Sequence, residues 1–447
     1  MFKKILIANR GEIALRIVTA CRELGIRTVA VYSEADEHAL HVRFADEEVC
    51  IGPARAIESY LNVPAIISAA EVTGADALHP GYGFLSESSY LAEAAAACGI
   101  TFIGPPPAVL RLMGDKVSAR QAMKHAGLPV LPGTATPPAT LPEALKAAKK
   151  LGYPLILKAT AGGGGRGMRV LGSSTDLERV WQSAQREAEA AFGLGDVYLE
   201  KYIEAPRHIE FQVLADDHGH VVHLGERECS IQRRHQKLIE ECPSVVLSDR
   251  QRRKLGRLVI DAAESVGYRN AGTFEFLMDS DEHFYFLEVN ARLQVEHPVT
   301  EMVTGTDIVK EQIRVASGAP LSFQQSDVTW TGHALECRIN AESPDTFRPS
   351  AGVIDVFSLA GGPGIRVDTA AHPGCTIPPH YDSLVAKMIA HGRDRDEAIA
   401  RMRRALQMTV IEGIQTSVPL HLRILDEPDF TAGRLSTAFM DRFASPP

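Results

Sequence analysis

The sequence of 447 residues lacks the patterns that mark several large classes of protein. No run approaches the ~18 apolar residues of a membrane-spanning helix, and the first apolar stretch ends at Asn9, too early for a signal peptide. The seven cysteines are an odd number, are scattered and form no Cys-x-x-Cys pair, which predicts a reduced, cytoplasmic protein without a structural zinc site. Lys and Arg (47) are outnumbered by Asp and Glu (56), and the resulting net charge of −9 argues against general binding to nucleic acid or anionic membranes.

The first hundred residues alternate between strand and helix patterns. Residues 4–8 form an apolar run, residues 13–24 carry apolar side chains at helical spacing, and residues 28–32 form the next apolar run. This order predicts a parallel α/β sheet up to about residue 105. The turn after the first strand lacks Gly-x-Gly-x-x-Gly, so a dinucleotide is not expected there.

The sharpest local feature is a glycine-rich segment between Lys158 and Met168, in which residues 162–165 are four consecutive glycines. Because glycine has no Cβ, the backbone N–H groups of such a loop can converge on phosphate oxygens. No Gly-Lys-Ser/Thr follows, so the segment is not a Walker A loop. Apolar β-type runs on both sides predict a flap that closes over a phosphate-bearing ligand. The alternative is a flexible hairpin, in which four glycines would lose conformational entropy for no purpose.

A second polar feature runs from residue 288 to residue 296. In an extended chain, alternate side chains share one face. The polar residues of that face would be Glu288, Asn290, Arg292, Gln294 and Glu296. A turn at residues 279–282 would form a hairpin that brings Glu275 near Glu288. Paired carboxylates with an amide oxygen suit Mg²⁺ held against phosphates, and an arginine suits a small planar anion, although a solvated edge strand shows the same alternation.

Two further polar stretches have two interpretations each. Residues 208–213 alternate between polar and apolar, which fits either a plain half-buried strand or a wall of the site. Residues 226–237 carry a dense set of charges, which is typical of a solvated loop. Beside a nucleotide flap, the same run is a candidate for neutralising phosphate and carboxylate charge.

Together these segments resemble the ATP-grasp enzymes. The two marker motifs are Tyr153-Pro-Leu-Ile-Leu-Lys158 with the glycine loop, and Phe286-Leu-Glu288-Val-Asn290-Ala-Arg292. Residues 7–14, 79–87, 113–116, 232–237 and 292–300 are similar to the biotin carboxylases of that superfamily, and the likeness runs from residue 2 to about residue 445.

The resemblance implies an α/β fold with three parts. These are an N-terminal Rossmann-like lobe with a parallel sheet (1–113), an ATP-grasp centre with a glycine-rich lid (114–330, lid about 131–203) and a C-terminal mixed-sheet lobe (331–447). It also implies a homodimer, and a biotin carboxyl carrier protein and carboxyltransferase subunits as partners. The segment Ala122-Met123-Lys124-His125 superficially resembles a biotin-bearing hairpin, but it lies in a helical stretch, so biotin is expected on a separate carrier.

The resemblance further implies roles for matching positions. ATP would be held by Lys116, Lys158, Gly164, Gly165, Glu200, Lys201, Tyr202, Ile203, His208, Gln232 and His235. Two Mg²⁺ ions, or Mn²⁺, would be carried against the nucleotide by Glu275, Glu288 and Asn290. Bicarbonate would be held by Lys237, Arg292, Gln294 and the backbone at Val295. Glu296 would be the general base, and Arg338 would meet bicarbonate and the ureido oxygen of biotin.

The implied reaction is the ATP-dependent carboxylation of carrier-bound biotin with bicarbonate through carboxyphosphate, as the first half-reaction of acetyl-CoA carboxylase in fatty-acid synthesis. The same half-reaction is common to propionyl-CoA, methylcrotonyl-CoA and pyruvate carboxylases. An ATP-grasp ligase that joins a carboxylate to an amine would lack the set Arg292, Gln294 and Glu296. A regulatory nucleotide-binding subunit would bind ATP without turnover.

Overall fold

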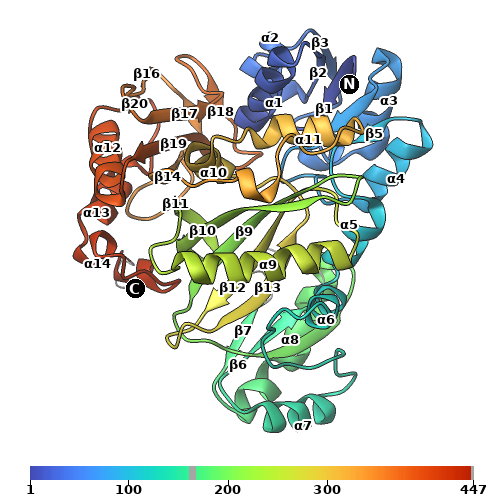
Figure 1. Ribbon diagram of the computed structural model, residues 1–447, viewed down its shortest axis with the longest axis vertical. Helices are drawn as coiled ribbons and strands as arrows, with labels where there is room; N and C mark the ends of the chain where they lie inside the picture. Colours follow the sequence, from blue (N-terminus) through green and yellow to red (C-terminus); the bar gives the residue numbers. More distant parts are fainter. Residues whose placement is uncertain (161–167, 444–447) are drawn as a thin grey trace.

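The computed structural model describes residues 1–160 and 168–443 (Figure 1). The N-terminal part consists of β1 (Lys4–Ile7), α1 (Gly11–Glu23), β2 (Arg27–Tyr32), α2 (Leu40–Phe44), β3 (Glu47–Cys50), α3 (Val63–Thr73), β4 (Ala77–His79), α4 (Ser89–Ala97) and β5 (Thr101–Phe102). Its strands form a parallel sheet in the order β3–β2–β1–β4–β5. The predicted α/β class with an N-terminal parallel sheet is confirmed.

Two helices lead from this sheet to the rest of the chain, α5 (Pro107–Gly114) and α6 (Lys116–His125). The sequence predicts one helical stretch over 108–127, but the chain changes direction at Asp115, whose carboxylate accepts a hydrogen bond from the Ser118 N–H at 2.7 Å and caps α6. This cap places Lys116 in the first turn of α6.

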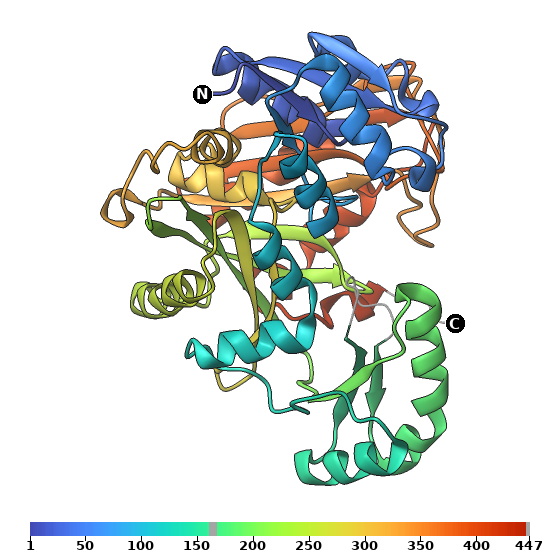
Figure 2. The same cartoon turned by 90° about the vertical axis from the view of Figure 1, so that its right-hand side faces the viewer.

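A small lobe follows and projects from the body of the molecule (Figure 2). It consists of α7 (Leu141–Leu151), β6 (Leu155–Ala159), β7 (Arg169–Leu171), α8 (Ser174–Phe192) and β8 (Val197–Lys201). The strands form an antiparallel sheet in the order β7–β6–β8, and Trp181 of α8 packs with Leu157 and Leu199 beneath it. The glycines of the predicted flap, among residues 161–167, lie outside the described residues.

The centre of the molecule is one antiparallel sheet of eight strands in the order β13–β12–β9–β10–β11–β14–β19–β17. Its strands are β9 (Arg207–Ala215), β10 (Val221–Arg233), β11 (Gln236–Cys242), β12 (Asn270–Met278), β13 (Phe284–Asn290), β14 (His333–Asn340), β17 (Ile365–Thr369) and β19 (Leu384–Gly392). The first five precede residue 330 and the last three follow it, so the sheet is continuous across the predicted boundary near that residue.

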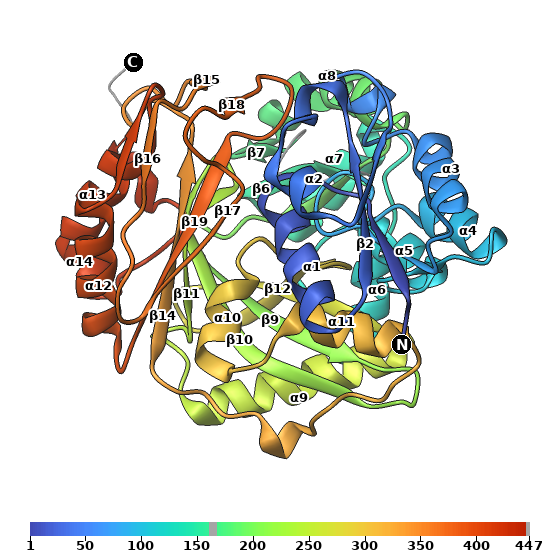
Figure 3. The ribbon, with the colours of Figure 1, turned by 90° about the horizontal axis from the view of Figure 1, so that it is seen from above.

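Helices cover this sheet in two places (Figure 3). The helices and strands not yet named are α9 (Asp249–Ser265), α10 (His297–Thr304), α11 (Ile308–Ala316), β15 (Gly352–Val353), β16 (Val356–Ser358), β18 (Thr376–Ile377), α12 (Arg395–Gln407), β20 (Val410–Glu412), α13 (Val418–Asp426) and α14 (Pro428–Thr431). Val259 of α9 packs with Phe211 and Phe274, and Met402 of α12 packs with Met388. No helix within the described ranges is long and apolar enough to cross a membrane.

Candidate functional site

A cavity of about 900 Å³ opens between the N-terminal sheet, the small lobe and the eight-stranded sheet. Most of the predicted site residues line it: Lys116, Lys158, Lys201, Tyr202, Ile203, His208, Gln232, His235, Lys237, Glu275, Glu288, Asn290, Arg292, Gln294, Val295 and Arg338. Glu200 and Glu296 are buried behind the lining residues, and Gly164 and Gly165 lie outside the described residues.

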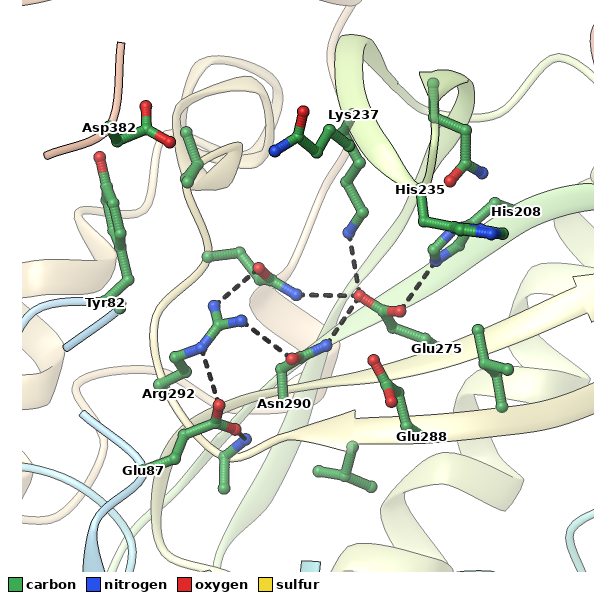
Figure 4. A pocket seen from close by; sticks show the side chains of 18 of the residues that line it. Tyr82, Glu87, His208, His235, Lys237, Glu275, Glu288, Asn290, Arg292 and Asp382 are labelled. Atoms are coloured by element: carbon green, nitrogen blue, oxygen red, sulfur yellow. Dashed lines mark hydrogen bonds and ion pairs between the residues drawn. The ribbon is translucent and has the colours of Figure 1, made fainter. Parts of the chain in front are cut away.

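The two carboxylates predicted to come together are direct partners across the β12–β13 hairpin, where Glu275 is paired in register with Glu288. One Glu275 oxygen accepts hydrogen bonds from Lys237 Nζ at 2.9 Å, Asn290 Nδ2 at 2.7 Å and Gln294 Nε2 at 3.0 Å (Figure 4). Its other oxygen lies 3.0 Å from His208 Nε2. Burial raises the pKa of Glu275, but Lys237 and His208 together hold that pKa well below its usual value. Glu275 is therefore an ionised carboxylate in the cavity wall.

Lys237 is the cationic centre of the site. Its ammonium lies 2.5 Å from Glu210, 2.9 Å from Glu275 and 2.6 Å from Glu296. Burial lowers the pKa of Lys237, but the three carboxylates raise it well above its usual value, so the ammonium form persists. The fully buried Arg227 supports this arrangement from behind, because its Nε donates to Glu210 at 2.6 Å.

Glu296 is fully buried between cations from two different strands. Besides Lys237 on β11, Arg338 on β14 donates from Nη2 to Glu296 Oε2 at 2.9 Å and from Nε to Glu240 at 2.6 Å. Burial opposes ionisation of Glu296, but Lys237, Arg338 and Arg227 lower its pKa far below the usual value. For Glu240 burial dominates over Arg338 and raises the pKa to about 7.

Arg292 faces the same cavity from the other side (Figure 4). It donates to Asn290 Oδ1 at 2.9 Å, to Gln294 Oε1 at 2.8 Å and to Glu87 Oε2 at 3.2 Å. The prediction of an extended chain over residues 288–296 is wrong beyond Asn290, where β13 ends. The irregular segment that follows, and not strand alternation, carries Arg292 and Gln294 to the cavity.

The opposite end of the cavity is lined by cations and imidazoles. Lys116 Nζ lies 3.3 Å from Glu288, and Lys158 Nζ donates to Glu200 at 2.5 Å. Burial first, then Lys158 and other neighbouring cations, lower the pKa of His235, which favours its neutral form. The segment 201–203 leaves β8 along the wall of the cavity beside these groups. This end can neutralise a polyanion such as a triphosphate.

Sequence models of three families match in succession along the chain. The biotin carboxylase N-terminal domain matches residues 1–110, the ATP-binding domain of the carbamoyl-phosphate synthase L chain matches residues 115–324, and the biotin carboxylase C-terminal domain matches residues 336–442. A biotin carboxylase from Allochromatium vinosum is 56% identical over 443 residues, which are 99% of this chain and 98% of that protein. The chain belongs to the biotin carboxylase family.

Two further relatives of the biotin carboxylase family are similar over the whole chain. The biotin carboxylase domain dimer of the Hydrogenobacter thermophilus 2-oxoglutarate carboxylase, solved with MgADP, ADP and bicarbonate, has a TM-score of 0.96 and 49% identity, covering 100% of each chain. A biotin carboxylase from Haemophilus influenzae is 55% identical over 443 residues, which are 99% of this chain and 99% of that protein. The predicted enzyme class, an ATP-grasp ligase of the biotin carboxylase type, is confirmed, and the predicted ATP, Mg²⁺ and biotin are the reactants of this family.

Several residues around the biotin carboxylase site are not identifiable from the sequence. The run 226–237 is a solvated loop only in part: residues 226–232 form the buried end of β10 and carry Arg227 into the core, whereas the turn at Arg234 and His235 is exposed and β11 begins at Gln236. The sequence leaves two interpretations open for Glu210 and assigns no role to Glu240 or Glu87. The alternation of polar and apolar residues within 228–232 is a signal for a strand, but no local pattern indicates which distant carboxylate pairs with which cation.

Proposed function

We propose that this chain is the biotin carboxylase component of an acetyl-CoA carboxylase, serving fatty-acid synthesis in the cytoplasm. The observation that carries the reaction is the placement of Glu296. This buried, ionised carboxylate lies between Lys237 and Arg338, next to the anion-binding groups of Arg292 and Gln294. The activation of bicarbonate by ATP requires a base next to an anion-binding pocket. Both must lie at one end of a cavity large enough for a triphosphate.

ATP binds at the end of the cavity that holds Lys116, Lys158, His235 and the segment 201–203. The cations neutralise phosphate charge, and Glu200 fixes the Lys158 ammonium through its 2.5 Å contact. His208 and Gln232, whose side chains are buried in the wall, and the glycines Gly164 and Gly165 complete this set in the proposal.

Bicarbonate binds against Arg292, Lys237, Gln294 and the backbone at Val295. Bicarbonate is a weak nucleophile, and Glu296 raises its reactivity by accepting its proton as it attacks the terminal phosphate of ATP. Carboxyphosphate and ADP are the products of this step. Because carboxyphosphate decomposes in water, a closed cavity protects it until it reacts.

The divalent cation fits the donors that the structure presents. Glu275 and Glu288 are directly opposite each other on paired strands, and Asn290 adds an amide oxygen, which together are the hard oxygen ligands that Mg²⁺ prefers. When bound, Mg²⁺ neutralises the charge that develops on the phosphate oxygens. Glu275 is already ionised and oriented for this purpose, since three donors bind one of its oxygens and His208 lies 3.0 Å from the other.

Biotin arrives on a separate biotin carboxyl carrier protein and leaves carboxylated for the carboxyltransferase subunits. Carboxyphosphate breaks down to CO₂ and phosphate, the phosphate accepts the proton of the ureido N–H, and that nitrogen bonds to CO₂. Arg338 is placed to stabilise the negative charge that develops on the ureido oxygen in this step. We also propose a homodimer, which the dimeric relative from Hydrogenobacter thermophilus supports.

The experiment measures phosphate release from ATP with and without bicarbonate and then with free biotin, together with transfer of labelled bicarbonate into acid-labile carboxybiotin. Incorporation that depends on ATP, Mg²⁺ and biotin supports the reaction. ATP cleavage indifferent to both bicarbonate and biotin refutes it. The final acceptor is tested by supplying the carrier and carboxyltransferase encoded with this chain, and comparing label transfer to acetyl-CoA, propionyl-CoA, pyruvate and 2-oxoglutarate. Preference for any acceptor but acetyl-CoA refutes the finer assignment.

A further inference from the structure

Lys387 is a fully buried lysine behind the wall of the cavity. It lies on β19, where it is paired in register with Arg338 of β14 on one side and with Asp368 of β17 on the other. Directly opposite residues of antiparallel strands place their side chains on the same face of the sheet. Arg338, Lys387 and Asp368 therefore form a row across three strands, facing the segment that contains Val295 and Glu296.

The Lys387 ammonium has a partner in each of three parts of the chain. It donates to the carbonyl oxygen of Val295 at 3.0 Å and lies 3.1 Å from Glu12 Oε2 of α1 and 3.7 Å from Asp368 Oδ2. Burial lowers the pKa of Lys387, but Glu12, Asp368 and Glu336 raise it above its usual value, so the group stays charged. Movement of this buried ammonium is costly, because it would break the hydrogen bond to Val295 and separate the charge from its two carboxylates.

The contact with Val295 bears directly on the base. The Val295 carbonyl belongs to the planar peptide that joins Val295 to Glu296, so fixing its oxygen also fixes the N–H and the Cα of Glu296. The carboxylate at the other end of Glu296 is fixed by Arg338 at 2.9 Å. The neighbouring residues Arg338 and Lys387 thus hold Glu296 at two points, the side chain and the preceding peptide.

We propose that Lys387 is a positioning residue for the biotin carboxylase reaction, which orients the Val295–Glu296 peptide so that the backbone at Val295 meets bicarbonate and Glu296 meets its proton. This inference rests on the proposed roles of Val295 and Glu296. Lys387 acts without contacting either substrate, because its ammonium donates to the Val295 carbonyl and lies beside the carboxylates of Glu12 and Asp368.

The test replaces Lys387 by methionine, which keeps the length and apolar stem of the side chain and removes the donors. In Lys387→Met we expect the KM for bicarbonate to rise about tenfold and kcat of bicarbonate-dependent ATP cleavage to fall by about tenfold or more, since misplacement by about 1 Å can cost 10²-fold. The KM for ATP stays within twofold of wild type, because the nucleotide end of the cavity is untouched. Lys387→Arg, which restores the charge, should recover part of the loss.

Folding is controlled with two further variants. Lys387→Met leaves Glu12 as a buried charge without its cation, so the double variant Lys387→Met/Glu12→Gln removes both charges together. Arg252→Met breaks a comparable buried ion pair, in which Arg252 binds Glu226 through two 2.7 Å contacts away from the cavity. It should lower the melting temperature without changing the KM for bicarbonate.

Several results would overturn the inference. One is a KM for bicarbonate that is unchanged in folded Lys387→Met or in the double variant. Another is a rise in the KM for bicarbonate in Arg252→Met as large as that in Lys387→Met. If both neutral variants fail to fold while Lys387→Arg keeps wild-type kinetics, Lys387 serves stability alone and the inference also fails. Failure of the proposed function is distinguishable, because wild-type protein would then show no bicarbonate-dependent ATP cleavage before any variant is made.

Discussion

Replacing Arg338 by glutamine should separate the two chemical steps of the reaction. The change removes the donors to Glu240 and Glu296 but leaves the 2.6 Å contact between Lys237 and Glu296. We therefore expect bicarbonate-dependent ATP cleavage to fall by less than about tenfold, because the base keeps one cation. Transfer to biotin should fall by about 10²–10³-fold, or about 3–4 kcal/mol of activation free energy, which is typical for loss of one donor to a developing oxyanion.

The stability of this variant should depend on pH in a direction that the structure sets. Neutralising one partner of a buried ion pair lowers the free energy of unfolding by about 3–5 kcal/mol when the other partner must stay charged. Burial already raises the pKa of Glu240 to about 7, and loss of Arg338 raises it further, so below pH 7 the carboxyl takes a proton and part of the cost disappears. The difference in melting temperature between Arg338→Gln and wild type should therefore be larger at pH 8.5 than at pH 6.

Both activities are measured on one preparation, phosphate release for the first step and acid-labile label on biotin for the second. The double variant Arg338→Gln/Glu240→Gln is the matched control, because it removes the carboxyl that Arg338→Gln leaves buried, and it should restore stability without restoring transfer to biotin. Equal loss of both activities would refute the assignment of Arg338 to the biotin step. A melting-temperature difference that is independent of pH would refute the reasoning about Glu240.

Three other changes test other parts of the site. Glu296→Gln should lower bicarbonate-dependent ATP cleavage by about 10²–10⁴-fold with nucleotide binding intact, and a rate within threefold of wild type would exclude it as the base. Glu288→Gln should raise the Mg²⁺ concentration needed for half-maximal rate by about tenfold, and an unchanged requirement would remove Glu288 from the metal ligands. Burial raises the pKa of Glu241, but His333 and Arg395 lower it from 4.5 to about 2. The ionised form of Glu241 thus adds about 3 kcal/mol to the free energy of unfolding above pH 4.5, and this contribution is lost as the pH falls toward 2. The melting-temperature deficit of Glu241→Gln should shrink between pH 7 and pH 3, and a constant deficit would contradict this.

Much of the fold could be predicted because its signals are local. Strand and helix periodicities place the first strand, the first helix and the second strand to within two residues of their observed ends. The turn at 279–282 does form the predicted hairpin, but a β-bulge between Glu275 and Phe276 shifts the register by one residue, and this shift places Glu275 opposite Glu288. Other boundaries depend on single caps, as at Asp115, where one side-chain hydrogen bond divides a helical pattern in two.

The rest of the site depends on contacts between distant parts of the chain. The charged run 226–237 has the composition of a loop, and the positions of Arg227 and Lys237 follow from the carboxylates that β9 and β12 bring to them. The charge of Arg227 is tolerated in the core because it pairs with Glu210. The two residues are 17 positions apart in the sequence, but Arg227 Nε lies 2.6 Å from a carboxylate oxygen of Glu210. Such pairs depend on sheet order, β12–β9–β10, which no local pattern in the chain specifies.

The antiparallel pairing of β11 with β14 limits how this enzyme can be recombined with its relatives. Lys237 and Arg338 lie on these two adjacent strands, whose ladder pairs Ile239 with Cys337 and Cys242 with Ala334. A chimera that exchanges the C-terminal quarter of the chain at residue 330 would therefore cut through one hydrogen-bonded sheet and not through a linker. Such an exchange replaces Arg338 on β14 and leaves Lys237 on β11. It should succeed only when the donor also supplies side chains that fit across the pairing of these two strands. The small lobe, whose three strands form a sheet of their own, is the more natural module to exchange.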